Sequence, residues 1–310
     1  MEILLYIGLF IISLGVLLKA SDWFVDGAEA IGLSLGISPF IIGLTIVAFG
    51  TSLPELATSI AAVLSGNSEI VVGNVIGSNI TNIALVLGLV AVFNKQIDLE
   101  YNIWHIDMPF LWGSAFMLWF VLKDFYLSLF EMLLLLTGIC VFLTYSFKGD
   151  DPGSKVEKQP TTWRSYFKLL LGGVLVWMSA DYTILAISEL SAQAGIDPEI
   201  IALSAVALGT SLPEVIVSLN AARKGNTALA VGNVLGSNVF NTYVVMSIPA
   251  IFGSLTIPVT ILDYFLPLMI VMTILFGIMA SNKKITRWEG CVLLLFYALY
   301  LGEIITETVG

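Results

Sequence analysis

The chain has 310 residues, of which 58% are hydrophobic and only 12% are charged, and its mean hydropathy is +0.96. Soluble domains carry about 25% charged residues, so this composition excludes an ordinary soluble domain and indicates a polytopic membrane protein. The formal net charge of −10 argues against a nucleic-acid partner, which would require a basic face.

Ten apolar segments are candidates for membrane-spanning helices, which need about 20 apolar residues each. In chain order, they are residues 3–35, 40–64, 70–93, 103–122, 125–147, 166–194, 200–222, 229–252, 259–280 and 288–305. The first and sixth segments are over-long and are expected to be tilted. The sequence thus predicts an all-α membrane protein with ten transmembrane helices.

One polar stretch, residues 148–164, divides the ten segments into two groups of five. Its residues 149–154 are rich in turn formers, and the stretch is too short to form a domain of its own. We therefore expect three regions: a first five-helix repeat at residues 1–147, a linker at 148–164 and a second five-helix repeat at 165–310.

The two groups carry the same polar motifs at a constant offset. The hexapeptide Gly-Thr-Ser-Leu-Pro-Glu occupies residues 50–55 and again residues 209–214, 159 positions later. The same offset relates the motif Gly-Asn-x-x-Gly-Ser-Asn at residues 73–79 to its copy at 232–238. Because five spans are an odd number, the two halves must cross the membrane in opposite directions. This predicts an inverted-topology repeat, with a binding site between the repeats.

Basic residues predict the orientation of the chain, because cytoplasmic loops are enriched in Lys and Arg. The loops that follow odd-numbered spans contain Lys95, Lys148, Lys155, Lys158, Arg164, Arg223, Lys224, Lys283, Lys284 and Arg287. The loops on the other side contain only Lys123. We therefore expect a multi-pass protein of the plasma membrane, with a cytoplasmic linker and both termini outside.

Each hexapeptide places a carboxylate and a helix-breaking proline inside an apolar segment. A charged side chain there costs roughly 2.5–3.5 kcal/mol on insertion scales. Pro54 frees backbone carbonyls of the preceding turn. Together with Thr51, Ser52 and Glu55, these carbonyls are candidate oxygen ligands, and residues 210–214 provide the same ligands in the second half. The structural alternative is an ion pair at each glutamate, but no Lys or Arg lies in the central part of these segments.

The following segments add neutral oxygens on one helix face. Ser78 and Asn82 are four residues apart, and Ser237 and Asn241 repeat them. Oxygen-only sites suit hard cations such as Ca²⁺ and Na⁺, and Mg²⁺ or Mn²⁺ less easily. Two carboxylates balance one Ca²⁺, and they could instead accept Na⁺ ions or protons. A site that holds either load but is costly to leave empty predicts obligatory exchange.

Four further acidic residues and one absence complete the inventory. Asp22 and Asp181 repeat at the same offset and are interpreted as caps of a helix break rather than as ligands. Glu131 and Glu289 are interpreted as interfacial residues near the starts of the fifth and tenth spans. The sequence offers no metal-binding His motif and no pairing of nucleophile and base, so we expect neither a cofactor nor an enzymatic activity.

The duplicated motifs resemble the α-repeats of the cation/Ca²⁺ exchanger superfamily, and most of all those of the sodium/calcium exchangers. The resemblance implies that Glu55 and Glu214 coordinate Ca²⁺ and share in Na⁺ binding. It also implies further ligands, namely the backbone carbonyls of Thr51, Thr210, Ala48 and Ala207 for Ca²⁺ and the serines Ser52, Ser78, Ser211 and Ser237 for Na⁺.

The position of Asn241 distinguishes branches of the superfamily. Members that also need K⁺ typically have Asp at the equivalent position, so Asn241 is similar to the K⁺-independent exchangers. Exchange of protons for Ca²⁺ or another divalent cation remains the alternative function, and a cation channel is a third. The expected partners are Ca²⁺, Na⁺ and the lipid bilayer, and a monomer is sufficient for the predicted site.

Overall fold

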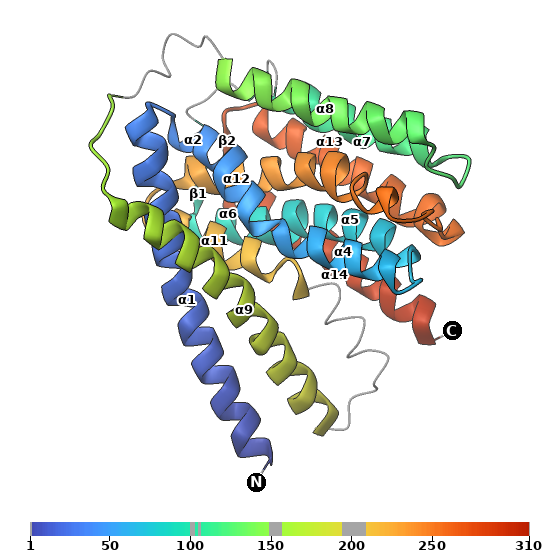
Figure 1. The fold of residues 1–310 in the computed structure, drawn as a ribbon, viewed down its shortest axis with the longest axis horizontal. Coiled ribbons are helices and arrows are strands. Elements are labelled where there is room, and N and C mark those ends of the chain that lie inside the picture. The colour runs from blue at the N-terminus through green and yellow to red at the C-terminus, as the bar shows by residue number, and fades with distance from the viewer. Residues whose placement is uncertain (1, 100–102, 105–106, 149–156, 194–208, 310) are drawn as a thin grey trace.

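The computed structural model describes residues 2–99, 103–104, 107–148, 157–193 and 209–309. The described residues are almost entirely helical and include one two-stranded sheet (Figure 1). The elements of the first half are α1 (Glu2–Leu35), α2 (Pro39–Ile42), η1 (Gly43–Val47), α3 (Ala48–Thr51), α4 (Leu53–Leu64), α5 (Glu69–Thr81), η2 (Asn82–Leu87), α6 (Gly88–Asn94), β1 (Gln96–Asp98), α7 (Asp107–Leu122) and α8 (Leu129–Lys148).

The second half begins with the long helix α9 and contains counterparts of most of these elements. They are α9 (Trp163–Gln193), α11 (Leu212–Arg223), α12 (Thr227–Phe240), η3 (Asn241–Val245), η4 (Pro249–Ile251), η5 (Ile261–Phe265), α13 (Leu266–Ala280), β2 (Lys284–Thr286) and α14 (Arg287–Val309). The first part of the seventh predicted span, residues 200–208, lies outside the described residues.

Eight helical segments of the described chain are long and apolar enough to cross a membrane. They are Ile3–Leu35, Pro39–Leu64, Glu69–Asn94, Leu129–Phe147, Trp163–Gln193, Thr227–Ile251, Ile261–Ala280 and Arg287–Thr306. Each coincides with one of the predicted spans. Helix α7 is a shorter apolar helix, and α11 covers only the second part of its predicted span. The all-α membrane class is confirmed, whereas the count of ten spans stays a prediction.

The two over-long helices, α1 and α9, lie side by side and run antiparallel (Figure 1). Near one end of the pair, the Thr183 hydroxyl donates a hydrogen bond to Ser13 Oγ at 3.0 Å. Near the other end, Lys168 Nζ lies 3.3 Å from Asp26 Oδ2. The pair packs on the rest of the molecule mainly through α11 and α2.

Helix α12 packs closely against α2 and η1, and two glycines make this approach possible. A Cβ at Gly232 would collide with the carbonyl of Phe40, and a Cβ at Gly236 would collide with the carbonyl of Leu44. These glycines are four residues apart and form the small-xxx-small pattern that allows helix backbones to approach. The close contact carries η1, and with it the first hexapeptide, against the second half of the chain.

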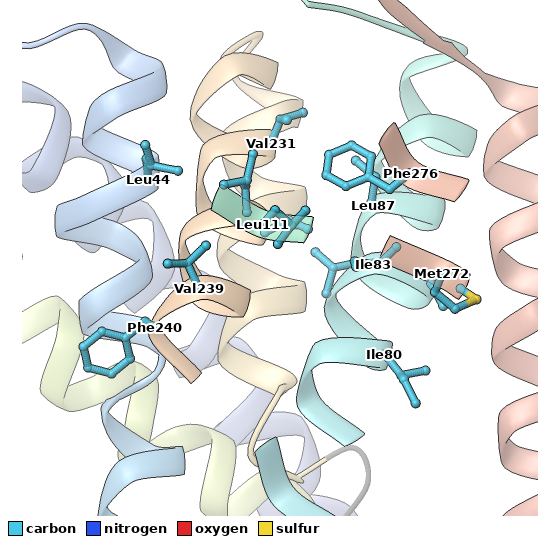
Figure 2. Close-up of a cluster of buried hydrophobic side chains, with 14 of the residues drawn as sticks. Leu44, Ile80, Ile83, Leu87, Leu111, Val231, Val239, Phe240, Met272 and Phe276 are labelled. Carbon is cyan, nitrogen blue, oxygen red and sulfur yellow. The ribbon is translucent and has the colours of Figure 1, made fainter. Parts of the chain in front are cut away.

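The apolar core surrounds these contacts. Figure 2 shows buried side chains from both halves, including Leu44, Ile83, Val239 and Phe276. The outside of the molecule is apolar as well: Phe130 of α8 is 74% exposed and Leu295 of α14 is 70% exposed. Large apolar side chains exposed on long helices are expected where lipid replaces water.

Loops that are distant in sequence meet at the ends of the helices. Strands β1 and β2 pair antiparallel, with Ile97 opposite Ile285. They join the connection after α6 to the connection after α13. Elsewhere, Ser68 Oγ lies 3.1 Å from Thr256 Oγ1 and accepts a hydrogen bond from the Thr256 amide at 3.0 Å. This pair joins the start of α5 to the connection after η4.

Candidate cation-binding site

The two hexapeptides begin a new helix in the same way. Ser52 separates α3 from α4 with φ −89° and ψ 5°, and Ser211 precedes α11 with φ −88° and ψ 0°. In both cases, proline stands at the second position of the new helix, where its missing N–H is not needed. The predicted break is therefore confirmed at the first hexapeptide, and at the second the described residues show the same start of a new helix.

Each break aims a glutamate at the middle of the molecule. Glu55 and Glu214 lie in the first turns of α4 and α11, where the helix dipole favours negative charge, and both are 0% exposed. Ser52 Oγ donates a hydrogen bond to Glu214 Oε1 at 3.1 Å, so the motif of one half reaches the carboxylate of the other.

Most of the carboxylate oxygens lack a partner. In the part of the chain that the structure describes, both oxygens of Glu55 and Oε2 of Glu214 are buried without a hydrogen bond. None of the ion pairs formed by the described residues involves either glutamate. A buried carboxylate is costly without a compensating partner. The arrangement therefore suits a bound cation or proton and gives no support to a structural ion pair.

Two asparagines hold the hexapeptide threonines across the repeat boundary. Thr51 Oγ1 donates to Asn233 Oδ1 at 3.2 Å, and Thr210 Oγ1 donates to Asn74 Oδ1 at 3.2 Å. The asparagine amides in turn donate to serines of the opposite helix in their own half, Asn74 to Ser59 at 3.0 Å and Asn233 to Ser218 at 2.9 Å. These bonds fix the two threonine side chains and tie each hexapeptide to the opposite half of the chain.

These asparagines and serines were not predicted as site residues. Asn74 and Asn233 belong to the duplicated Gly-Asn-x-x-Gly-Ser-Asn motif, and Ser59 and Ser218 obey the same offset of 159. The signal was therefore present in the repeat. Only the fold shows that the asparagines support the threonines of the opposite half.

The predicted serines of the two repeats differ in their hydrogen bonds, and the predicted alanines do not all lie within the described residues. Ser78 Oγ lies 3.4 Å from Asn74 Oδ1 and 3.5 Å from Thr210 Oγ1. The hydroxyls of Ser211 and Ser237 are buried without a partner among the described residues. The Ala48 carbonyl accepts a hydrogen bond from the Ser52 amide at 3.0 Å, and Thr51 Oγ1 lies 3.4 Å from it, so a cation would have to share this oxygen with the backbone. Ala207 lies outside the described residues.

Asn82 and Asn241 each begin a π-helical segment. These segments are η2 (Asn82–Leu87) and η3 (Asn241–Val245). Such widened turns are rare in proteins overall, and those that occur often lie at functional sites. Both side chains are 0% exposed. Segment η2 packs against α11, which carries Glu214, and η3 packs against α4, which carries Glu55. The sequence did not predict the π-helical turns.

The charge of the site comes from the two glutamates alone as far as the described ranges extend. Within them, no group of three or more His, Cys, Asp or Glu side chains could hold a metal ion. The surrounding polar atoms are neutral hydroxyls and amides. Two carboxylates surrounded by neutral oxygens fit a hard cation and do not fit a metal that is bound by thiolate or imidazole ligands.

Three of the other acidic residues singled out in the sequence, Asp22, Glu131 and Glu289, form structural contacts. Helix α1 runs unbroken through Asp22 and α9 through Asp181, so the interpretation of both residues as caps of a helix break is wrong. The Asp22 carboxylate instead pairs with Lys224 at 3.1 Å and accepts from Asn220 at 2.9 Å. Glu131 and Glu289 accept hydrogen bonds from Ser128 and Thr286 at the starts of α8 and α14, which are capping boxes.

Comparisons with known proteins agree with this geometry. The sequence profile of the family described as "Sodium/calcium exchanger protein" matches residues 5–148 and 164–305. The chain is 32% identical to "Sodium/calcium exchanger MaX1" of Methanosarcina acetivorans, over 94% of this chain and 96% of that protein. It is also 32% identical to the membrane protein MJ0091 of Methanocaldococcus jannaschii, over 99% of this chain and 100% of that protein.

A solved structure of the sodium-calcium exchanger NCX_Mj, soaked with zero Na⁺ and Ca²⁺, has a similar fold. The TM-score is 0.83 at 30% sequence identity, covering 97% of this chain and 99% of that chain. The apolar helices and these likenesses together establish a multi-pass membrane protein of a transporter family. On this profile match, these identities and this shared fold, the chain belongs to the sodium/calcium exchanger family.

Proposed function

We propose that the protein is a secondary active antiporter that exchanges Na⁺ for Ca²⁺ across the membrane by alternating access. The observation that carries this function is the pair of buried glutamates, Glu55 and Glu214, whose oxygens mostly lack partners among the described residues. They come from the two halves of a sodium/calcium exchanger fold, and Ser52 of the first motif contacts Glu214 of the second. The activity is transport rather than an enzymatic reaction, and no cofactor takes part.

In this proposal, the two glutamates are the charged ligands of both ions. The further Ca²⁺ ligands are the backbone carbonyls of Thr51, Thr210, Ala48 and Ala207. The Na⁺ ligands include the serines Ser52, Ser78, Ser211 and Ser237, and Asn82 and Asn241 line the site. The hydrogen bonds of both threonines support this assignment, because they tie each hexapeptide to the opposite half and so hold the two sets of ligands together.

Exchange follows from the cost of an empty site. Two buried carboxylates repel each other and are poorly stabilised without a counter-charge in a low-dielectric interior. One Ca²⁺ neutralises the pair, and Na⁺ ions can do the same. The change between inward-facing and outward-facing states is therefore slow without an ion load, which makes transport of one ion depend on the other. The antiparallel pair α1 and α9 is the candidate moving element, because it holds none of these ligands.

The proposed topology has ten spans in two inverted five-helix repeats, with regions 1–147, 148–164 and 165–310. The contacts between loops support it. Strands β1 and β2 join the connections after spans three and nine, whereas Ser68 and Thr256 join those after spans two and eight. In a ten-span arrangement, connections after odd-numbered spans lie on one side of the membrane and those after even-numbered spans on the other. Each of the two contacts joins connections on the same side, as this arrangement requires. The two stretches matched by the family profile also agree with two repeats.

The orientation and setting of the protein complete the proposal. We place the protein in the plasma membrane with a cytoplasmic linker and both termini outside, on the basis of the Lys and Arg distribution. The site is formed within one chain, so a monomer in lipid is sufficient.

Uptake of radiolabelled Ca²⁺ into proteoliposomes tests the function. Vesicles loaded with Na⁺ and diluted into Na⁺-free buffer should accumulate Ca²⁺, and dilution into equal Na⁺ should abolish uptake. The same measurement with only a pH gradient, and with or without K⁺, separates the alternatives. Uptake driven by protons and indifferent to Na⁺ would replace the proposal with proton/divalent-cation exchange. Ca²⁺ flux that needs no counter-ion would indicate a channel.

A further inference from the structure

Two equivalent asparagines clasp helices α5 and α12 where the two repeats meet. Asn79 Nδ2 donates to the backbone carbonyl of Asn238 at 3.4 Å, and Asn238 Nδ2 donates to the carbonyl of Asn79 at 3.3 Å. Both side chains are buried. The two bonds are reciprocal, as expected for residues that are related by the internal repeat.

The side-chain oxygens of the same two residues break this symmetry. Asn238 Oδ1 accepts a hydrogen bond from Asn82 Nδ2 at 3.1 Å. The repeat would pair Asn79 Oδ1 with Asn241 Nδ2 in the same way. Instead, within the described structure, Asn79 Oδ1 and both amide atoms of Asn241 are buried without a partner.

A single residue difference between the repeats accounts for the asymmetry. The amide nitrogen of Asn79 also donates to the Thr242 hydroxyl at 3.0 Å. The position equivalent to Thr242 in the first half is Ile83, which has no hydroxyl. Thr242 therefore holds the Asn79 amide in an orientation that has no equivalent at Asn238. As a result, in the described structure, the side-chain bond forms between Asn82 and Asn238 but not between Asn241 and Asn79.

The bond between Asn238 and Asn82 has a chemical consequence for the site. An asparagine amide has nearly the same shape with its oxygen and nitrogen exchanged, but only the oxygen can bind a cation. Since Asn238 engages the nitrogen of Asn82, the oxygen of Asn82 is the free end. That oxygen is buried without a partner in the described chain, one turn beyond Ser78 on the same helix face.

We propose that Asn238 is a positioning residue for cation binding: it fixes the Asn82 amide so that Oδ1, and not the NH₂ group, faces the ion. Among the described residues, no side chain holds the Asn241 amide in this way. Asn82 therefore presents its oxygen in a fixed orientation, whereas the Asn241 amide is free to turn either its oxygen or its nitrogen toward the ion. This inference rests on the proposed exchange function and on the place of Asn82 beside the site.

Matched substitutions of the two clasp residues test the inference. Asn238→Leu should raise the Ca²⁺ concentration for half-maximal uptake about fivefold to tenfold, as the loss of one oriented hydrogen bond predicts, with little change in the maximal rate. Asn79→Leu removes more hydrogen bonds, to Asn238, Thr242 and Met269, but none to Asn82. It should change this concentration less than twofold. The Ca²⁺-dependent rise in melting temperature in detergent should shift to higher Ca²⁺ only for Asn238→Leu.

A double-mutant cycle with Asn82→Ala separates positioning from a general loss of structure. Asn82→Ala should raise the half-maximal Ca²⁺ concentration by itself, and adding Asn238→Leu should raise it no further. Additive effects, or equal shifts for Asn238→Leu and Asn79→Leu, would overturn the positioning role. If Asn82→Ala alone changes nothing, the assignment of Asn82 to the site is wrong. If either leucine variant elutes as aggregate on size-exclusion chromatography, Asn238→Ala and Asn79→Ala replace the pair.

Discussion

At the scale of single residues, the two motif glutamates are identical in sequence but not in environment. Glu214 receives a hydrogen bond from Ser52, whereas both oxygens of Glu55 lack a partner among the described residues. The two carboxylates can therefore bind ions with different strengths although the motifs around them are the same. Both are needed in the proposed function, because one Ca²⁺ requires two negative charges for neutrality.

Glu55→Gln and Glu214→Gln should each reduce Na⁺-driven Ca²⁺ uptake to the level of protein-free vesicles. Glutamine keeps the size of the side chain but removes one of the two charges, so Ca²⁺ is left with an uncompensated charge in a buried site. The measurement is uptake at matched protein density. Glu131→Gln, at the capping box of α8 and away from the site, should keep the wild-type rate. Wild-type uptake by both site variants would disprove the assignment.

Asn241→Asp should change ion selectivity more than stability. Both amide atoms of Asn241 lack partners in the described structure, so the substitution breaks no hydrogen bond there. It adds a third carboxylate to the site, and superfamily members that need K⁺ typically have Asp at this position. We expect Ca²⁺ uptake by the variant to respond to K⁺, while its melting temperature stays within a few degrees of wild type. An unchanged ion profile would remove Asn241 from the site.

At the scale of elements, ion pairs attach α1 to the end of α11, and the lysine that makes them is present in only one of the two repeats. Lys224 Nζ lies 2.7 Å from Asp26 Oδ1 and 3.1 Å from Asp22 Oδ1. The equivalent of Lys224 in the first half is Ser65, which carries no charge. Partial burial lowers the pKa of Lys224, but hydrogen bonds to Asp26 and Asp22 raise it by more, so its pKa lies above the usual value. The side chain is therefore charged at physiological pH.

Lys224→Ala should lower the melting temperature in detergent by roughly 1–4 °C, because half-exposed ion pairs contribute about 0.2–1 kcal/mol each. Since the folded-state pKa is raised, this contribution is present at neutral pH and is lost only as the pH rises through that pKa. Lys168→Ala removes the pair with Asp26 at 3.3 Å, which joins α1 to α9 and not to α11. It should cause a smaller shift. No difference between wild type and Lys224→Ala would show that these pairs add no stability.

At the scale of the whole molecule, the topology makes a prediction about accessibility. In a background with Cys140 and Cys291 replaced by Ala, Lys123→Cys should react with a membrane-impermeant maleimide added to intact cells. Lys158→Cys, in the linker, should react only after the membrane is permeabilised. Both lysines are exposed, so burial does not obscure the comparison. Labelling of the linker position from outside would reverse the proposed orientation.

Much of the architecture is written in local sequence. Hydropathy marks the long helices, the prolines of the two hexapeptides mark the helix breaks, and eight described segments coincide with predicted spans. Such features depend on neighbours within a few residues and are therefore readable from the chain alone. The interpretation of Asp22 was wrong for the opposite reason. Its partners, Asn220 and Lys224, are about 200 residues away in sequence.

By itself, then, the sequence determined that two copies of an oxygen-rich motif with one carboxylate each lie inside an apolar chain. The tertiary structure alone decided which atoms of the two copies meet. Ser52 reaches Glu214 and Thr51 reaches Asn233, and Asn238 holds Asn82 through a bond that the described structure does not repeat between Asn79 and Asn241. The physical reason is that a repeat fixes local conformation in both copies, whereas hydrogen-bond partners depend on how the copies pack. There, one hydroxyl at Thr242 in place of Ile83 is enough to make equivalent amides unequal.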